Sequence, residues 1–470
     1  MFILTAWAKP DWPSDTGIMA EAGIVMDMDS GAILYGQNIH LPYYPASITK
    51  ILTALIVLEN CNLQDTVTFS TTAVNQVEAD SGNKISVVAG DELSVEDCLY
   101  SLLLVSSNQA ANALAEHTAG SIPAFVDMMN EKLAQLGCQE SHFENPSGLN
   151  NDNQYVSAYD MALIAQAAYD NETLVEISSA TTHKIAPTTQ NPDGFTLRGE
   201  HRLCVTEDPS SPYYYPEAVA GKTGYLIKAG NTLVTYAVKD NRRLISVILK
   251  GQPRQYFVDG KALLEFGFRS FQDYTVADYE SRYVTGNETI NLDKGSFQAS
   301  DLMIDPDSVI TLPNAASFED ADITLGALPE ISPDNAVALL TYSYNDRTIG
   351  TAYLLAKDGI IIDGDDSAAE AATTAFDTAN AEAPLATTAS NAEKPQRPHK
   401  HISVAGVLIT ILIVLLVLGV IGLISWFIYS KKKEAKALAE RRERRRQRLQ
   451  HSGDEEEFER LLAEYKNKKK

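Results

Sequence analysis

Hydrophobic and polar residues alternate in two short runs near the start of the chain. The runs Gly23–Asp27 and Ala32–Tyr35 flank the turn-forming residues Met28–Gly31, a pattern typical of a β-hairpin. Two longer alternating runs, Gly230–Lys239 and Arg243–Lys250, predict a second hairpin much later in the chain. A strand pair at each end predicts one sheet that is built from both ends of this region.

Between the two strand pairs the apolar positions repeat at helical spacing. Ile48–Leu58 is apolar on nearly every side, which predicts a helix that is buried in the centre of a domain. Helical spacing also runs through Asp97–His117, Ile122–Leu136 and Ala158–Ala168, which predicts that the middle of this region is mostly helical. The expected fold class of residues 18–270 is therefore α+β, an antiparallel sheet covered by helices.

The pattern changes after this region. From Asp273 to Asp358 the chain has short alternating runs with turn residues between them, such as Ser308–Leu312, and these predict a separate, smaller β domain over residues 271–360. Residues 361–401 are rich in Ala, Thr, Asp and Glu. This segment has too few large apolar residues to form a core, and we therefore expect a solvated linker there.

A long apolar segment separates the linker from the C-terminal tail. Residues Ile402–Tyr429 are 28 consecutive residues without a charge, dominated by Ile, Leu and Val. A helix that spans a membrane needs only about 20 apolar residues. The tail, residues 430–470, is basic, and an excess of Lys and Arg marks the cytoplasmic side. We therefore expect a single-pass cell-membrane protein whose preceding domains are extracellular and whose tail is cytoplasmic.

Residues 1–17 contain a short segment that resembles the end of an export signal. Ala6-Trp-Ala8 resembles the small-x-small cleavage site of a signal peptide whose basic and apolar parts are missing. An ordinary N-terminal coil fits these residues equally well, and both interpretations stay open.

Charge and composition exclude several classes of function. The chain has 38 Lys and Arg against 62 Asp and Glu, a net charge of -24, which is the wrong sign for a nucleic-acid partner. No HExxH motif is present, and we expect neither a metal nor a cofactor. The four cysteines form no CxxC pair, and an exported chain allows three pairings; we favour buried free thiols for Cys61, Cys98, Cys138 and Cys204.

Ser47-Ile-Thr-Lys50 is the first of three short motifs that suggest chemistry. It lies at the start of the predicted buried helix, so Ser47 and Lys50 share one helix face. A serine hydroxyl becomes a good nucleophile when a neighbouring base takes its proton, and a neutral lysine is such a base. The signal is weak alone, because the same spacing recurs by chance at Ser430.

Two later motifs add polar residues where the apolar pattern does not explain them. Ser106-Ser-Asn108 interrupts a helical apolar segment, either as a loop between two helices or as part of a site. Lys222-Thr-Gly224 opens the second strand pair, where it is either a turn or a place of close backbone approach. Lys222 and Thr223 would offer a cation and a hydroxyl to a carboxylate.

In this order, the three motifs resemble the signature of penicillin-binding proteins and serine β-lactamases. The surrounding residues narrow the resemblance to the low-molecular-weight D-alanyl-D-alanine carboxypeptidases. The similar blocks are Pro45-Ala-Ser-Ile-Thr-Lys, Val105-Ser-Ser-Asn-Gln-Ala-Ala, Phe143-Glu-Asn-Pro-Ser-Gly-Leu, Ser157-Ala-Tyr-Asp-Met-Ala and Gly221-Lys-Thr-Gly-Tyr-Leu-Ile-Lys-Ala-Gly. The resemblance implies a β-lactamase/transpeptidase-like catalytic domain over residues 18–270, with a helical subdomain, followed by the β domain that these enzymes carry.

The resemblance also implies a role for each motif residue. Ser47 would be the nucleophile, Lys50 its base and Ser106 the hydroxyl that relays a proton to the leaving amine. The implied substrate-binding residues are Asn108 for the substrate amide, Lys222 close to Ser106, Thr223 for the terminal carboxylate, Gly224, and Tyr225, whose N–H would share the oxyanion hole with that of Ser47.

Two departures from the family pattern affect the rim of the site. Leu226 stands where these carboxypeptidases usually have threonine. An arginine upstream of Lys222 usually helps to bind the carboxylate, and either Arg198 or Arg202 fits that description.

We therefore expect a serine-type carboxypeptidase that removes the terminal D-alanine from peptidoglycan stem peptides ending in D-alanyl-D-alanine, and that β-lactams acylate. The alternatives are a non-catalytic penicillin-binding wall sensor, a peptidoglycan endopeptidase and a β-lactamase. The last is disfavoured, because no E-x-x-L-N lies between Asn108 and Lys222. The sequence predicts no oligomeric state.

Overall fold

The computed structural model of the chain describes residues 9–77, 85–329, 331–360 and 362. The predicted membrane segment 402–429 and the basic tail lie outside these residues, as does all of the predicted linker except residue 362. Within the described residues, no helix is both long enough and apolar enough to cross a membrane.

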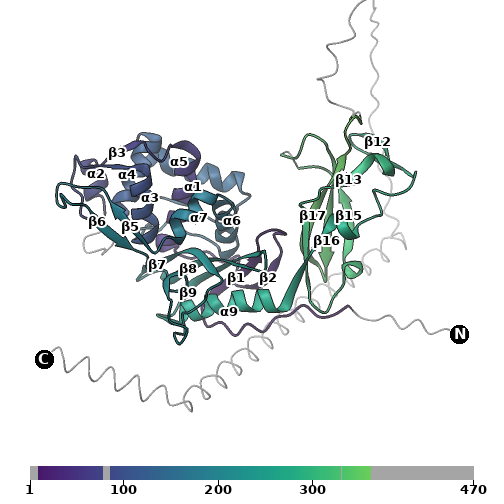
Figure 1. Ribbon diagram of the computed structural model, residues 1–470, viewed down its shortest axis with the longest axis horizontal. Coiled ribbons are helices and arrows are strands. Elements are labelled where there is room, and N and C mark those ends of the chain that lie inside the picture. Colours follow the sequence, from purple (N-terminus) through teal and green to yellow (C-terminus); the bar gives the residue numbers. More distant parts are fainter. Residues whose placement is uncertain (1–8, 78–84, 330, 361, 363–470) are drawn as a thin grey trace, which may run out of the picture. The chain divides into compact units, whose positions relative to one another are not determined.

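A five-stranded antiparallel sheet forms the centre of the first domain (Figure 1). The strand order is β2-β1-β9-β8-β7. Its strands are β1 (Ala22–Asp27), β2 (Ile33–Gln37), β7 (Ala218–Leu226), β8 (Gly230–Lys239) and β9 (Arg242–Gly251). Strand β1 pairs with β9, so that Met26 lies opposite Ile245. The predicted sheet from both ends of the region is thereby confirmed.

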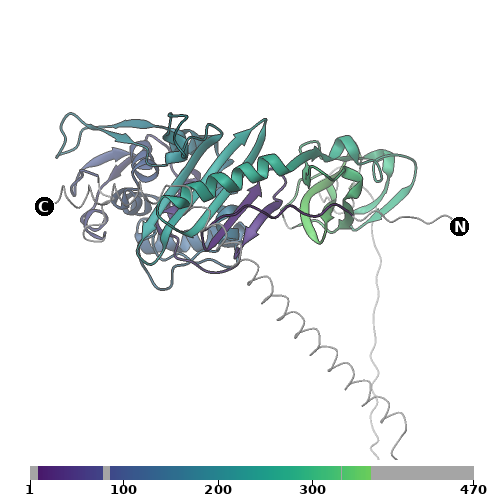
Figure 2. The same ribbon diagram turned by 90° about the horizontal axis from the view of Figure 1, so that it is seen from below.

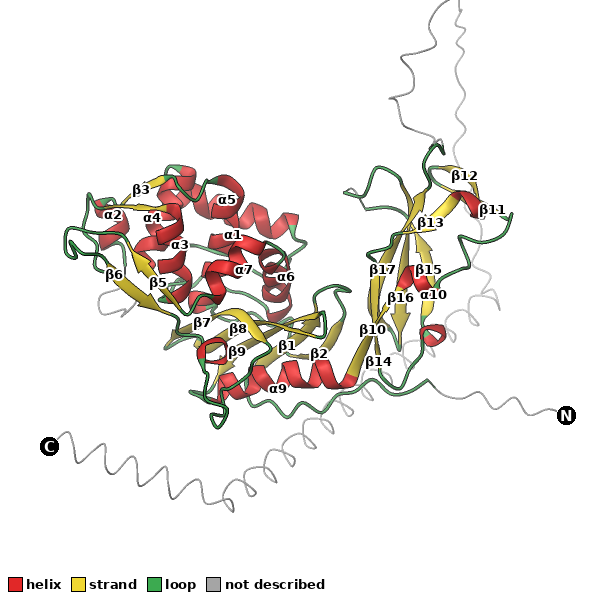
Figure 3. Cartoon of the chain, viewed as in Figure 1, coloured by secondary structure: helices red, strands yellow, loops and turns green. Residues whose placement is uncertain are grey.

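Helices cover both faces of this sheet (Figures 1 and 3). On one face lie α1 (Lys50–Asn60), α2 (Thr71–Asn75), α3 (Val95–Leu104), α4 (Asn108–Ala119), α5 (Ile122–Gln135), α6 (Ala158–Tyr169) and α7 (Glu172–Ser179). Helix α9 (Gln255–Ser270) lies across the strands on the other face (Figure 2). The alternation along β1 explains the two layers, because Ile24 and Met26 pack in the core below the helices while Val25 packs in the core beside α9.

Helix α1 lies at the centre of the helical layer. It contacts α3, α4, α5 and α6, and its residues from Lys50 to Val57 are buried. The prediction of a buried central helix is therefore confirmed. Smaller elements at the edge of this layer are the hairpins β3 (Thr66–Thr68) with β4 (Glu92–Ser94) and β5 (Thr182–Ile185) with β6 (Phe195–Arg198), followed by the short helix α8 (Arg202–Val205).

The helical spacing predicted over Asp97–His117 is confirmed as two helices, because the chain breaks between α3 and α4. Ser106 has a φ of 61°, in the left-handed region that ends a helix. The Ser107 side chain then accepts a hydrogen bond from the Ala110 N–H at 3.1 Å and caps the N-terminus of α4. The polar interruption at Ser106-Ser-Asn108 is therefore a loop between two helices.

A second, β-rich domain follows α9. The strands pair in three sheets: β10 (Phe271–Thr275) with β14 (Val309–Pro313), β11 (Thr289–Leu292) with β12 (Gly295–Gln298), and β13 (Leu302–Ile304), β17 (Arg347–Ala356), β16 (Ala336–Tyr344) and β15 (Asp322–Gly326) in that order. One short helix, α10 (Val276–Tyr279), follows β10. The domain has a core of its own, in which Tyr342 and Tyr344 are the largest buried side chains.

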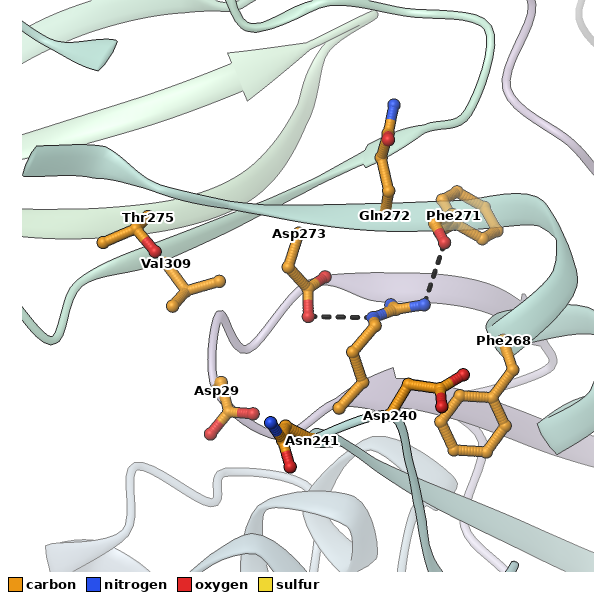
Figure 4. Close-up of a pocket in the computed structure, with 10 residues that line it drawn as sticks. Asp29, Asp240, Asn241, Phe268, Phe271, Gln272, Asp273, Thr275 and Val309 are labelled. Carbon is orange, nitrogen blue, oxygen red and sulfur yellow. Dashed lines mark hydrogen bonds and ion pairs between the residues drawn. The ribbon is translucent and has the colours of Figure 1, made fainter. Parts of the chain in front are cut away.

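Arg242 joins the two domains through an ion-pair network beside a surface pocket (Figure 4). Its guanidinium donates to Asp273 of β10 at 2.8 Å and to Asp27 of β1 at 3.1 Å. Ser30 and Thr311 extend the network, with their hydroxyl oxygens 2.7 Å apart. Asp273 and Asp27 thus share one cation, and the turn after β1 is tied to β14.

The four cysteines are free thiols. Cys98 and Cys138 are buried, while Cys61 and Cys204 are half-buried. Burial raises the pKa of Cys138 to about 12, so this thiol stays protonated at neutral pH.

Candidate active site

Ser47 and Lys50 lie together at the start of α1. A tight 3-10 turn, Ala46–Thr49, precedes the α-helix, and Ser47 is half-buried within it while Lys50 is fully buried. The Lys50 Nζ and the Ser47 Oγ are 3.0 Å apart. A hydroxyl and an amine at this distance can exchange a proton directly.

Two carbonyl oxygens hold the Lys50 amine in place. Its Nζ donates to the Asn108 side-chain oxygen at 2.8 Å and to the Ser147 backbone carbonyl at 2.6 Å. Neither oxygen can donate, so a neutral amine that gives both its N–H bonds to them turns its lone pair toward Ser47. Burial lowers the pKa of Lys50 well below its usual value, and the positive charge of Lys222 lowers it further.

Strand β7 forms the opposite wall of the site. The 3-10 turn contacts β7 and β8, and Thr232 of β8 donates a hydrogen bond to the Pro45 carbonyl at 2.9 Å. A Cβ atom at Gly224 would lie 2.8 Å from the Ser47 backbone nitrogen and 2.4 Å from the Thr232 hydroxyl. Only glycine therefore allows β7 to approach the serine this closely.

Lys222 is the second buried cation of the site. Its side chain is 2 % exposed, and its Nζ donates to the Thr223 carbonyl at 2.9 Å. Burial lowers the pKa of Lys222 to about 8, while the Glu200 carboxylate acts in the opposite direction. Most of this lysine is therefore charged at neutral pH.

Ser106 contributes a hydroxyl that has no partner within the described part of the chain. Its Oγ is buried without a hydrogen bond, and its backbone has a φ of 61°. An unsatisfied buried hydroxyl costs stability and a left-handed serine is strained, so both features are typical of a functional position. Asn108, two residues later, already contacts Lys50.

The described residues contain no cluster of three or more His, Cys, Asp or Glu side chains able to hold a metal ion. The pocket of Figure 4 is lined by none of the eight predicted site residues. We therefore place the candidate site between the start of α1 and β7, where the Lys50 amine contacts Ser47 and Asn108.

The sequence matches the D-alanyl-D-alanine carboxypeptidase family over residues 9–252, which is more than half of the chain. The chain belongs to this family. It is 30% identical over 281 residues to the D-alanyl-D-alanine carboxypeptidase DacF of Bacillus subtilis, covering 58% of this chain and 69% of that protein. It is 31% identical over 355 residues to the D-alanyl-D-alanine carboxypeptidase DacA of Haemophilus influenzae, covering 72% of this chain and 84% of that protein.

A solved structure agrees with the sequence matches. Penicillin-binding protein 5 of Haemophilus influenzae superposes with a TM-score of 0.56 at 26% identity and covers 75% of this chain and 98% of that chain. This superposition covers a larger share of the chain than the family match over residues 9–252 does. The structural similarity to this protein therefore extends beyond the first domain into the β domain.

At the rim of this carboxypeptidase site, the side chain of Tyr225 is 62% exposed and Leu226 is half-buried. The two arginines considered for the carboxylate are both exposed. Arg202 lies over the Tyr213 ring at 5.1 Å, and Arg198 lies in the β5–β6 hairpin. Within the described residues, neither arginine has a hydrogen bond or ion pair with the eight site residues.

Sequence reasoning missed two features that hold this site together. Ser147 supplies a backbone carbonyl, and no side-chain pattern predicts such a contact. Gly148, with a φ of 83°, lies against the 3-10 turn so closely that a Cβ would be 1.9 Å from the Ala46 carbonyl oxygen. The Pro146-Ser-Gly148 sequence was a signal for a tight turn, although not for its place beside Ser47.

Proposed function

We propose that this protein is a serine-type D-alanyl-D-alanine carboxypeptidase that removes the terminal D-alanine from peptidoglycan stem pentapeptides. The observation that carries the proposal is the buried Lys50 amine, 3.0 Å from the Ser47 hydroxyl and held by two acceptors. Burial and the Lys222 charge lower the pKa of Lys50, which favours the neutral amine that a serine nucleophile needs as its base. The family match over residues 9–252 supports the same activity.

The first half of the reaction forms an acyl-enzyme. Neutral Lys50 takes the Ser47 proton, and the Oγ attacks the carbonyl carbon of the penultimate D-alanine. The developing oxyanion is stabilised by the backbone N–H groups of Ser47 and Tyr225, because fixed donors cost no reorganisation when the charge forms. The C–N bond then breaks, and the leaving amine receives a proton through the Ser106 hydroxyl, whose hydrogen-bonding capacity is unused.

The second half of the reaction releases the shortened peptide. Water enters after D-alanine leaves, gives a proton to the same base and attacks the ester carbonyl, which regenerates the Ser47 hydroxyl. Before the first step, the terminal carboxylate pairs with Lys222 and Thr223, since a charged amine and a hydroxyl make strong hydrogen bonds to it. Penicillins present a carboxylate and a reactive amide in the same relation, and we propose that they acylate Ser47.

We further propose that the protein is anchored in the cell membrane by residues 402–429, with the catalytic domain outside and the tail 430–470 inside. The support is the length of the uncharged segment and the basic residues that follow it. Fractionation tests the anchor: the full chain is expected in the membrane fraction after a carbonate wash, and a chain ending at residue 401 in the soluble fraction. A full chain that washes off would contradict the anchor.

The activity is tested by D-alanine release from a stem pentapeptide by the detergent-solubilised full chain. Wild type is expected to release one D-alanine per peptide, and Ser47→Ala none above background. Ser430→Ala is the matched control, because it removes the serine of the chance S-x-x-K sequence, and it is expected to be fully active. A folded wild type that releases no D-alanine would refute the proposed activity.

A further inference from the structure

A buried histidine lies directly behind the strand that carries Lys222. His201 comes before α8 and is only 7% exposed. A Cβ atom at Gly221 would lie 2.5 Å from its Nε2 and 2.4 Å from the Val234 carbonyl oxygen. The imidazole therefore touches the backbone of the residue that immediately precedes Lys222.

The neighbours of His201 determine which of its nitrogens carries the proton. Its Nε2 is 3.1 Å from the Val234 carbonyl and 3.2 Å from the Thr235 hydroxyl. A carbonyl only accepts, so Nε2 carries the hydrogen. Nδ1 is then free to accept from the thiol of Cys204, whose Sγ is 3.2 Å away.

The imidazole is neutral in this setting. Burial and, to a smaller extent, the Lys222 charge lower the pKa of His201 to about 4, although the hydrogen bond to the Val234 carbonyl acts in the opposite direction. Within the described residues, the titratable groups around the ring are Lys222 on β7, Cys204 on α8 and the preceding Glu200. Its other neighbours are uncharged: Val234 and Thr235 of β8 and Phe257 of α9. A neutral imidazole adds no third cation beside the two lysines.

Gly221 is held from its other side as well. The Ser178 hydroxyl of α7 accepts from the Gly221 N–H and donates to the Gly221 carbonyl, both at 3.3 Å. The peptide before Lys222 is thus fixed between α7 and the His201 ring. Because its backbone is fixed in this way, the Lys222 side chain starts from one defined position, from which its amine can meet a carboxylate.

We propose that His201 is a positioning residue for substrate binding: its neutral ring holds the Gly221 peptide so that the Lys222 amine meets the terminal carboxylate of the substrate. The inference rests on the proposed carboxypeptidase function and assigns this residue to it. The hydrogen bonds to Val234 and Cys204 orient the ring, and His201 itself touches neither the substrate nor the reacting atoms.

The test compares two substrates on the solubilised full chain: an acyl-D-alanyl-D-alanine peptide and the same peptide with its terminal carboxylate converted to an amide. His201→Phe keeps a ring but loses both nitrogens. We expect it to raise KM for the carboxylate substrate about tenfold, the order expected when a buried hydrogen-bonding group loses its partner. We expect its effect on the amide substrate to stay within about twofold, because Lys222 has no carboxylate to meet there.

Two further variants separate positioning from folding. His201→Gln offers a donor and an acceptor again, and is expected to restore most of the lost affinity. His183→Phe is the matched control, because this half-buried histidine bonds Asp97 at 2.7 Å and contacts none of the eight site residues directly. It is expected to lower the Tm and to leave the ratio between the two substrates unchanged.

A double-mutant cycle completes the test. On a Lys222→Ala background, His201→Phe is expected to cost nothing further, since its effect acts through Lys222. An equal loss with both substrates, or a full additional loss on the Lys222→Ala background, would overturn the inference. If wild type itself releases no D-alanine, the failure belongs to the proposed function and not to His201.

Discussion

Lys50 and Lys222 are two buried lysines that need opposite protonation states. Lys50 acts as a base only when neutral, and burial together with the charge of Lys222 lowers its pKa well below the usual value. Lys222 binds a carboxylate only when charged, and its pKa is about 8. The acid limb of the activity profile therefore belongs to Lys50 and the alkaline limb to Lys222.

We expect the pH dependence of kcat/KM to be bell-shaped. It rises as Lys50 loses its proton and falls above about pH 8 as Lys222 loses its own. Lys222→Arg keeps a cation at every accessible pH, so its residual activity is expected to show no fall between about pH 8 and 10. Initial rates of D-alanine release across this range measure both profiles, and an unchanged alkaline limb in Lys222→Arg would contradict the assignment.

Gly148 provides a second test at the residue scale. Gly148→Ala places a methyl group against the Ala46 carbonyl, at a position 1.9 Å from its oxygen. Left-handed strain costs about 1–2 kcal/mol and forced repacking about 1–3 kcal/mol more. Gly137 is the matched control, because its φ of 74° is similar and a Cβ there has nothing within 4 Å.

Gly137→Ala is therefore expected to show the strain alone and full activity per folded molecule. Gly148→Ala is expected to lose more stability and also activity, since the displaced turn carries Ser47. Urea denaturation and D-alanine release measure the two effects. Equal stability losses in the two variants would show that the close contact at Gly148 has no energetic weight.

The side chains of the candidate site could be proposed from the sequence. The backbone contacts that hold them in place could not. Spacing and order single out Ser47, Lys50, Asn108 and Lys222 in the sequence, and the structure brings Lys50 into contact with Ser47 and Asn108. The Ser147 carbonyl was not found, because every residue has one and only the tertiary fold selects it. The assigned roles of these residues remain predictions.

At the scale of elements, two were missed for physical reasons. Helix α9 contains Gly260 and Gly267, and glycine lowers helix propensity by about 1 kcal/mol relative to alanine. Both glycines face the sheet, where a Cβ would be 2.8 Å from the Leu233 side chain and 2.7 Å from the Leu244 side chain, so a larger residue would displace these leucines. Strand β7 was not predicted as a strand, because Ala218-Val-Ala-Gly-Lys-Thr-Gly has few β-forming residues. The sequence indicated only a turn, or a close backbone approach, before the strand pair.

The cap of α4 gives a test at this scale. Ser107→Ala removes the acceptor for the Ala110 N–H and is expected to cost about 1 kcal/mol of stability. Ser121→Ala removes the equivalent cap of α5, where the Ser121 hydroxyl accepts a hydrogen bond from the Ala124 N–H at 3.3 Å. Similar stability losses are expected from both variants in thermal denaturation.

Only Ser107→Ala is expected to reduce D-alanine release. The reason is that α4 begins with Asn108, which holds the Lys50 amine. Equal activity in both variants would show that the end of α4 does not position this contact.

At the scale of the whole molecule, Arg242 ties β10 of the β domain to the central sheet through Asp273 and Asp27. Arg242→Ala leaves the Asp27 and Asp273 carboxylates without their cation, and the Asp27 side chain is fully buried. Breaking one side of a buried ion pair costs about 3–5 kcal/mol. Arg242→Lys is expected to recover only part, because one ammonium cannot reproduce the guanidinium fork that also reaches the Phe271 carbonyl.

The neighbouring Arg243 supplies the control for this prediction. Its side chain is 34% exposed, and one of its partners, Asp170, is 69% exposed. Arg243→Ala is therefore expected to cost less than about 1 kcal/mol. Calorimetry of the three variants measures the difference, and equal costs for Arg242→Ala and Arg243→Ala would contradict the view that the junction depends on a buried network.

The most direct test of the central claim is the mass of the intact full chain after incubation with benzylpenicillin, followed by peptide mapping. A covalent acyl-enzyme at Ser47 predicts a stoichiometric increase of one penicillin mass, located on the peptide that contains Ser47 and absent in Ser47→Ala. Lys50→Met is expected to remain unmodified as well, because the nucleophile has lost its base. An adduct on another residue, or a folded wild type with no adduct at all, would contradict the account.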